Sequence, residues 1–508
     1  MDDQTAAIAF LSDPATHAAD RPVQTIQTHI SHIFLTGPLA FKLKRALRLP
    51  YADFSTPDLR LAACEKELAL NRRTAPDLYQ RIRRITTRAG GGLEFDGPGR
   101  LVDAVVQMRR FEQRDLFDRM AQDGRLDAAL MADTARRIAA FHQGAPVIET
   151  DRGAEAMAAV LDINLAGFAA GKVFAPAQVQ VLDGLCRQAL ARHAALLDRR
   201  AAQGRLRRCH GDLHLRNICL LDGRPRLFDC IEFNDELASC DMLYDLAFLL
   251  MDLCHRGLGD LGNLVMNRYL DITGDDEGFV LLPFFMAVRA SVRAHVIATG
   301  AETGTGAEAE ARAYHDLALS LLRPPSLPQA RPQLVAIGGR SGTGKTTIAD
   351  MLAPRLGPAP GARVIESDRI RKALHGVPAD SPLPEAAYRA QVSAHVYDQM
   401  IRRAELILSG GGMVVADAVF ERASNRQDIA DCAARAGAPF LGIWLQAPAE
   451  VLHSRVAARR GGPSDATTDI LARQLRRDPG DITWQCLDAG RAPEQGCAHI
   501  LALLNGAP

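Results

Sequence analysis

The pattern of hydrophobic and polar positions divides the chain into two parts of different architecture. Before residue 325, alternating runs around the turn at Thr36, Gly37 and Pro38 predict short strands between residues 24 and 50. Residues 60–73 have apolar positions at helical spacing, and residues 115–202 are rich in alanine and leucine and predict further helices. After residue 333, apolar strand-like runs alternate with helical segments. The pattern therefore predicts an α+β domain followed by an α/β domain with a parallel sheet.

A proline-rich segment separates the two patterns. Residues 323–333 read RPPSLPQARPQ, and their four prolines interrupt helical patterning and favour an extended linker. We therefore predict a first domain over residues 1–325, a linker over 326–333 and a second domain over 334–508. The length of 508 residues is sufficient for two large domains.

Composition and charge exclude several classes of protein. Lysine plus arginine and aspartate plus glutamate number 60 each, so no net basic field exists to attract a nucleic acid or an anionic membrane. The start, MDDQTAAIAF, is acidic where an export signal is basic, and the most apolar run contains Asp245 and Asp252. The ten cysteines form no CxxC pair, which favours reduced thiols over a metal site. We expect a soluble cytoplasmic protein that binds neither membranes nor nucleic acids.

The first part carries a group of polar residues suited to phosphoryl transfer. Residues 210–217 read HGDLHLRN, and a strand-like hairpin leads from them to Asp229 in LFDCIEF. A carboxylate on such a loop can accept the proton of a substrate hydroxyl, while an amide and a second carboxylate hold Mg²⁺ against phosphates. We predict Asp212 as the base, and Asn217 and Asp229 as the metal ligands.

This group resembles the aminoglycoside phosphotransferase and choline kinase branch of the protein-kinase-like fold, in which HGDxxxxN replaces HRDxxxxN. The segment DMLYDLA, with Asp241 and Asp245, resembles the next helix of that family, and residues 105–113 resemble its adenine-binding hinge. One departure is the early hairpin, which has a single glycine, Gly37, in place of a glycine-rich loop.

The resemblance also implies an early strand lysine, paired with a glutamate on the following helix, that holds the phosphates of ATP. Lys42 and Lys44 lie on one strand face because side chains repeat every two residues, and the sequence favours Lys42 without excluding Lys44. Glu67 is the predicted partner, with Glu65 as the alternative.

The second part carries a phosphate-binding loop. The motif GxxxxGK[ST] falls between a predicted strand and a predicted helix, where backbone N–H groups can turn toward phosphates. We expect Lys345 to reach the β- and γ-phosphates and the hydroxyl of Thr346 to bind Mg²⁺. The predicted nucleotide-binding residues are Gly339, Arg340, Ser341, Gly342, Thr343, Gly344, Lys345, Thr346 and Thr347.

Two further carboxylates follow predicted strands of this part. Asp368 lies at the carboxyl edge of the expected sheet, where ligands bind, and is a candidate base; the alternative is a helix cap. Asp417 ends an apolar run and suits the Walker B position, which steadies Mg²⁺. The loop and SDxxRK segment resemble small-molecule P-loop kinases such as gluconate and shikimate kinases, the zeta-toxin group and polynucleotide kinases. That resemblance implies that Arg371 or Arg369 binds a substrate anion, and Arg426, Arg455, Arg459 and Arg460 are candidate mobile cations.

Together the two resemblances predict a tandem kinase, similar to fused proteins that join an aminoglycoside phosphotransferase to an ATP-binding domain. The cofactors would be ATP and Mg²⁺, and the acceptor a hydroxyl of a sugar, polyol, amino alcohol or aminoglycoside. One alternative is a single active kinase half that is regulated by ATP in the other half. A nucleic-acid end kinase is less favoured, because aromatic residues make up 5% of the chain and its net charge is zero.

Overall fold

The chain folds into two compact units, each with its own core. The computed structural model describes residues 3–49, 52–300, 306–323, 333–459 and 462–506. Unit 1 comprises Met1–Asp252 and Phe285–Leu319, and unit 2 comprises Leu253–Phe284 and Ser320–Pro508. The predicted linker lies outside the described residues except for Gln333. The predicted domain limits stay predictions, and the contacts add that residues 253–284 group with unit 2.

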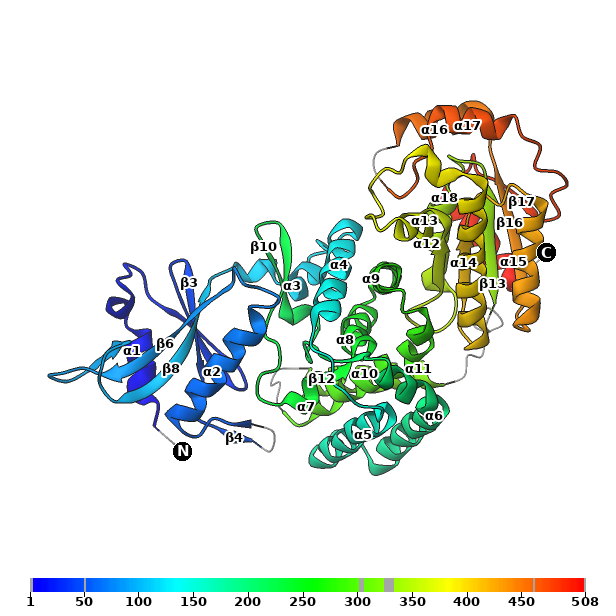
Figure 1. The fold of residues 1–508 in the computed structure, drawn as a ribbon. Helices are drawn as coiled ribbons and strands as arrows, with labels where there is room; N and C mark the ends of the chain where they lie inside the picture. Colours follow the sequence, from blue (N-terminus) through cyan, green and yellow to red (C-terminus); the bar gives the residue numbers. More distant parts are fainter. Residues whose placement is uncertain (1–2, 50–51, 301–305, 324–332, 460–461, 507–508) are drawn as a thin grey trace. The chain divides into compact units, whose positions relative to one another are not determined.

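Unit 1 begins with a six-stranded antiparallel sheet in the order β1-β2-β3-β8-β6-β7. Figure 1 shows β3, β6 and β8 of this sheet beside α1 and α2. Helix α1 packs on one face, where Ala7 and Leu11 meet Phe41 and Leu43 of β3. Helix α2 packs on the other face with Cys64 near Ala40, so the even-numbered positions of β3 face α2. The elements are α1 (Thr5–Ser12), β1 (Gln24–Gln27), β2 (Ser31–Thr36), β3 (Leu39–Lys44), α2 (Pro57–Asn71), β6 (Tyr79–Thr87), β7 (Leu93–Phe95) and β8 (Leu101–Arg109).

The rest of unit 1 is largely helical, as the sequence predicted. Two short antiparallel pairs lie among these helices, and the hairpin β10–β11 follows the HGD segment directly. The predicted hairpin is present, but its second strand ends at Leu227, before Asp229. The elements are α3 (Phe117–Gln122), α4 (Ala128–Gly144), α5 (Gly153–Ala170), α6 (Pro176–Ala202), β9 (Leu206–Arg208), β10 (Ile218–Leu221), β11 (Arg224–Leu227), β12 (Ser239–Asp241), α8 (Met242–His255), α10 (Leu282–Ala298) and α11 (Ala307–Leu322). The predicted α+β class is confirmed.

Unit 2 contains a five-stranded sheet in the order β14-β15-β13-β16-β17, with every neighbouring pair parallel. The predicted α/β class is confirmed, and β17 is a strand that the sequence pattern did not reveal. In this order, β14 and β15 lie on one side of β13, and β16 and β17 lie on the other side. Ligands bind beside the carboxyl ends of the strands at such a switch point. The elements are β13 (Leu334–Gly339), α12 (Lys345–Leu352), β14 (Arg363–Glu366), α13 (Ser367–Leu374), α14 (Ala390–Ser409), β15 (Val414–Asp417), α15 (Ala423–Arg435), β16 (Phe440–Gln446), α16 (Ala449–Ala458), α17 (Thr468–Leu475), β17 (Gln485–Asp488) and α18 (Pro493–Leu504).

An earlier piece of the chain completes unit 2 beside the edge strand β14. This piece holds α9 (Gly259–Thr273) and the 3₁₀ helix η4 (Asp276–Leu281). The buried Arg363 of β14 donates to Asp276 at 2.7 Å and to Asp271 at 2.7 Å. Asn263 of α9 donates to the carbonyl oxygen of Pro360 at 2.8 Å. These charged groups are paired within the interior, so α9 and η4 are integral parts of unit 2.

Two helical stretches of the described chain are long and apolar enough to cross a membrane by length and composition alone. They are Gly153–Ala170 and Asp276–Ala298, and the second is 78% buried. A core helix of a soluble protein passes the same test, so these two stretches carry little weight by themselves.

Candidate active sites

In unit 1, the predicted lysine–glutamate pair is formed, and both candidate lysines take part. Lys42 Nζ lies 2.8 Å from Glu67 Oε1 and also contacts the Asp229 carboxylate. Lys44 Nζ lies 2.6 Å from Glu67 Oε2 and contacts Glu232. Burial alone would lower the pKa of Lys42, but its carboxylate neighbours hold that pKa well above the usual range. The lysine is therefore charged at neutral pH and directed toward Asp229.

The HGD segment places its aspartate and asparagine against each other. Asn217 Nδ2 donates to Asp212 Oδ2 at 2.8 Å and to the Asp212 carbonyl oxygen at 2.9 Å. Burial alone would raise the pKa of Asp212, but the charges of His214, His210 and Arg293 outweigh it and hold that pKa below its usual range. Asp212 is therefore an ionised carboxylate in a fixed orientation.

Asp229 follows the hairpin in a loop conformation, not within a strand. It lies two residues beyond β11 and has a φ of 65°. Its backbone N–H donates to the hydroxyl of the buried Tyr79 at 3.1 Å. A non-glycine residue in this region is uncommon and marks a conformation that its surroundings impose. The side chain of Asp229 remains partly exposed, while its backbone is anchored.

Asp245, at the start of α8, holds the backbone of the HGD segment. Its two carboxylate oxygens accept from the N–H of His210 at 3.1 Å and of Gly211 at 2.8 Å, and His142 contacts it at 3.0 Å. From α10, Arg289 donates to the Gly211 carbonyl oxygen at 3.0 Å. Asp245 therefore positions the backbone of the HGD segment. The sequence did not identify Arg289, which lies 78 residues away.

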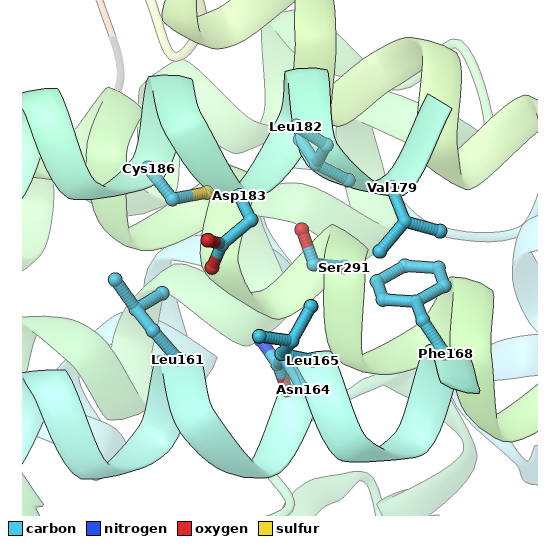
Figure 2. Close-up of a pocket in the computed structure, with 9 residues that line it drawn as sticks. All are labelled: Leu161, Asn164, Leu165, Phe168, Val179, Leu182, Asp183, Cys186 and Ser291. Carbon is cyan, nitrogen blue, oxygen red and sulfur yellow. The ribbon is translucent and has the colours of Figure 1, made fainter. Parts of the chain in front are cut away.

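A cavity of about 10 Å³ lies between α5 and α6, with Ser291 of α10 at its side (Figure 2). This volume matches a single water molecule, so no sugar or amino alcohol fits there. Ser291 is two positions from Arg289, and residues two apart on a helix face different sides. The cavity therefore does not belong to the HGD site. Its lining includes Leu161, Asn164, Leu165, Phe168, Val179, Leu182, Asp183 and Cys186.

In unit 2, the predicted phosphate-binding loop joins β13 to α12. Gly339 has a φ of 137°, and a Cβ there would lie 2.6 Å from the Leu445 carbonyl oxygen, so only glycine fits. Lys345 Nζ donates to the Arg340 carbonyl oxygen at 3.1 Å, across the loop. The N–H of Ser341 donates to Gln474 Oε1 at 2.9 Å, a contact from α17 that the sequence did not reveal.

The remaining residues of the loop differ in their surroundings. Gly342 and Gly344 have φ values of 88° and 82°, and Thr343 Oγ1 donates to the Arg340 carbonyl oxygen at 2.8 Å. The side chain of Arg340 itself donates to the Arg477 carbonyl oxygen at 3.2 Å. Thr347 is exposed in the first turn of α12.

Three carboxylates gather at the carboxyl edge of the sheet. Asp417, at the end of β15, accepts from Thr346 Oγ1 at 2.6 Å and is the register partner of Glu366 on β14. Burial raises the pKa of Asp417 to about 6 and that of Glu366 to about 8, despite the charges of Lys345 and Arg369 respectively. Burial also raises the pKa of Asp368 in the first turn of α13. The sequence did not identify Glu366 as a site residue, although it directly precedes the SDxxRK segment.

The arginines proposed as anion ligands or mobile cations are mostly engaged with the protein. Arg369 lies 2.8 Å from Glu366, and Arg371 donates to the Ala387 carbonyl oxygen at 2.7 Å. The buried Arg426 donates to four backbone carbonyl oxygens, which makes it a structural residue. Among the other candidates, Arg455 donates to the Ala489 carbonyl oxygen, Arg459 directly follows α16, and Arg460 lies outside the described residues.

Comparison with known proteins supports the two-part organisation. Residues 40–279 match the phosphotransferase enzyme family, and residues 334–478 match an AAA domain. Uncharacterized proteins of Mycobacterium tuberculosis and Mycobacterium bovis are each 32% identical over 499 residues, covering 96% of this chain and 97% of theirs.

Solved structures match the two parts separately. A choline/ethanolamine kinase family protein from Mesorhizobium loti is 16% identical, with a TM-score of 0.39, over 63% of this chain and 94% of that one. A gluconokinase from Sinorhizobium meliloti is 23% identical, with a TM-score of 0.24, over 34% of this chain and 91% of that one.

The two domains and their sites define an ATP-dependent kinase, a phosphotransferase with a kinase-like α+β domain and a P-loop α/β domain. The predicted resemblance to a fusion of these two families is confirmed. The chain belongs to the same family as the two mycobacterial proteins, with a phosphotransferase enzyme family domain followed by an AAA domain.

Proposed function

We propose that both units are kinases and that each transfers the γ-phosphate of ATP to a hydroxyl of a small molecule. The observation that carries the proposal is the pairing in unit 1 of Lys42 with Glu67 and Asp229, beside Asp212 fixed by Asn217. Each group has a role in phosphoryl transfer, which depends on positioning and on charge neutralisation. The acceptor classes are sugars, polyols, amino alcohols and aminoglycosides.

In unit 1, Asp212 would accept the proton of the attacking hydroxyl. Its lowered pKa keeps it ionised, and Asn217 holds Oδ2 in place, so a substrate hydroxyl can donate to the carboxylate. Lys42 would release Asp229 and bind the α- and β-phosphates. Asp229 and Asn217 supply the oxygen ligands that Mg²⁺ prefers, and the ion would neutralise phosphate charge.

In unit 2, the loop and Lys345 would surround the phosphates, and Asp368 would act as the base. The raised pKa of Asp368 makes its carboxylate a better proton acceptor. Thr346 and Asp417 already lie 2.6 Å apart, so their oxygens fit a Mg²⁺ site. The ion would again offset the charge of the phosphates.

A small, soluble acceptor in the cytoplasm fits the rest of the chain. The zero net charge gives no track for a nucleic-acid backbone, which argues against an end kinase. The ten cysteines are free, and seven of them are buried, as expected in a reducing compartment. The acceptor is therefore expected among cytoplasmic metabolites or drugs that carry hydroxyl groups.

One observation favours a second function, in which ATP in unit 2 regulates unit 1. Residues 253–279 lie within the phosphotransferase family match, yet they group with unit 2. In that unit, Arg369 lies 3.5 Å from Asp271 of α9 and 2.8 Å from Glu366 at the edge of the sheet. Regulation requires nucleotide binding at one site to change affinity at the other.

The test is ADP formation by the full chain with a panel of sugars, polyols, amino alcohols and aminoglycosides. Wild type is compared with Asp212→Ala, with Lys345→Ala, and with Asp222→Ala, a control at an exposed ion pair in unit 1. If different acceptors depend on Asp212 and on Lys345, both units are kinases. If one acceptor needs Asp212 alone and Lys345→Ala changes only its KM or kcat, unit 2 is regulatory. If neither substitution reduces any stimulated turnover, the proposal is wrong.

A further inference from the structure

Five charged side chains of unit 1 form a continuous chain of ion pairs. The order is Asp229, Lys42, Glu67, Lys44 and Glu232, so the charge alternates at every step. All of these side chains except Asp229 are buried. This series of ion pairs begins at the partly exposed Asp229 and continues into the interior.

Lys44 is the lysine of this series that solvent does not reach. It is fully buried, and it lies between the carboxylates of Glu67 and Glu232. By contrast, Lys42 contacts Asp229, whose side chain is 39% exposed. Only Lys42 is therefore placed to move onto a nucleotide phosphate.

The two oxygens of Glu67 are divided between the two lysines. Oε1 binds Lys42 at 2.8 Å, and Oε2 binds Lys44 at 2.6 Å. A turn of the carboxylate about its last torsion would lengthen both the hydrogen bond that Oε1 accepts from Lys42 and the ion pair of Oε2 with Lys44. Lys44 therefore fixes the plane in which Glu67 meets Lys42.

Glu232 connects this arrangement to the loop that carries Asp229. The two residues are three positions apart in one segment, and each contacts one of the two lysines of β3. The pair Lys44–Glu232 joins this loop to β3 independently of Asp229, in addition to the hydrogen bond from the Asp229 backbone to Tyr79.

We propose that Lys44 and Glu232 are positioning residues for ATP binding in unit 1, acting through Glu67 and the Asp229 loop. This inference rests on the proposed kinase function of unit 1. Loss of the partners that orient a functional ligand reduces binding or activity by about tenfold or more. The pair should therefore set the affinity for MgATP without touching it.

A double variant separates this role from a contribution to folding. Lys44→Met with Glu232→Gln removes both charges together, so neither of these two residues is left as an unpaired buried charge, as it would be in the single variants. Glu67 keeps its pair with Lys42 at 2.8 Å. The matched control is Lys66→Met with Asp235→Asn. That exposed pair, at 2.8 Å, joins α2, the helix of Glu67, to Asp235, three residues beyond Glu232.

The experiment uses the full chain with Lys345→Ala, so that MgATP binding reports unit 1. Calorimetric titration should show Kd raised about tenfold in the Lys44/Glu232 double variant and unchanged in the control. Thermal unfolding of all variants is measured in parallel, and binding is measured well below each Tm. Lys42→Met serves as the reference for loss of the phosphate contact.

A labelling readout tests which lysine touches phosphate. An acyl phosphate of ATP transfers its acyl group to a lysine amine beside the bound phosphates and releases ATP. Label on Lys42 and none on Lys44 supports the inference, and label on Lys44 overturns it. Wild-type affinity in the double variant, with binding lost in Lys42→Met, would reduce the pair to a core ion pair. If Lys42→Met also binds normally, the proposed function of unit 1 falls as well.

Discussion

Replacing Asp245 by asparagine should destabilise unit 1 by about 2–3 kcal/mol at pH 7. Asp245 is fully buried and accepts from the backbone of His210 and Gly211 and from His142. Burial alone would raise its pKa, but the hydrogen bond from His142 and the nearby charges lower that pKa to about 2. The difference from the ordinary value of 3.8 corresponds to about 2–3 kcal/mol.

The sign of the pH dependence follows from the direction of this pKa. A carboxylate with a lowered pKa in the folded state stabilises that state above its ordinary value of 3.8. The contribution is lost as the pH falls toward 2. The difference between wild type and Asp245→Asn should therefore be constant from pH 7 to pH 5 and should shrink at pH 3.

The two tryptophans make the assay specific for each unit. Trp444 and Trp484 both lie in unit 2, so tryptophan fluorescence follows only that unit. In urea titrations, Asp245→Asn should shift part of the far-ultraviolet circular dichroism transition and leave the fluorescence transition in place. Asp222→Asn, at an exposed pair with Arg109, should shift neither by more than about 0.5 kcal/mol. An unchanged dichroism transition, or a difference that persists undiminished at pH 3, would refute the reasoning.

Three further predictions concern unit 2. Asp417→Asn should stabilise the metal-free unit by up to about 3 kcal/mol at pH 8 and by little at pH 4, because burial raises the pKa of Asp417 and so penalises its ionised form. The measurement is a urea titration in EDTA followed by tryptophan fluorescence. A stabilisation that is larger at pH 4 than at pH 8 would contradict this reasoning. Gly339→Ala forces a Cβ against the Leu445 carbonyl, so calorimetry should find one MgATP site per chain in place of two. Arg363→Met removes the 2.7 Å ion pair of Arg363 with the buried Asp276, which should lower the free energy of unfolding of unit 2 by about 3–5 kcal/mol in the fluorescence transition. A decrease of less than about 1 kcal/mol would contradict the structural role of this pair.

The parts of the sites that depend on nearby residues could be predicted from the sequence. Asp212 and Asn217 are five positions apart, and the turn between them brings them into contact. The loop from Gly339 to Thr346 is dictated by its glycines and by the strand and helix on either side. The period of hydrophobic positions and the local backbone conformation determine these features, and both can be predicted from a short stretch of sequence.

The parts that depend on distant partners could not be predicted. Glu232 lies 188 positions from Lys44, and Gln474 lies 133 positions from Ser341. Nothing in a single sequence connects two polar residues at such separations. The same reason explains why the sequence left Lys42 and Lys44 as alternatives, since the burial of the second lysine depends on where the Asp229 loop packs.

The interleaving of the two units has a consequence for synthesis on the ribosome. Residues 253–284 emerge before the sheet of unit 2, and Asp276 precedes its partner Arg363 by 87 residues. At about 5–20 residues per second, this acidic helical segment waits on the order of ten seconds for its arginine. Residues 285–319, meanwhile, return to the unit that began at the amino terminus. Unit 1 can therefore complete its fold only after residues 253–284, which belong to unit 2, have been synthesised between its two parts. Cutting the gene at the proline-rich segment would separate residues 253–284 from the rest of unit 2.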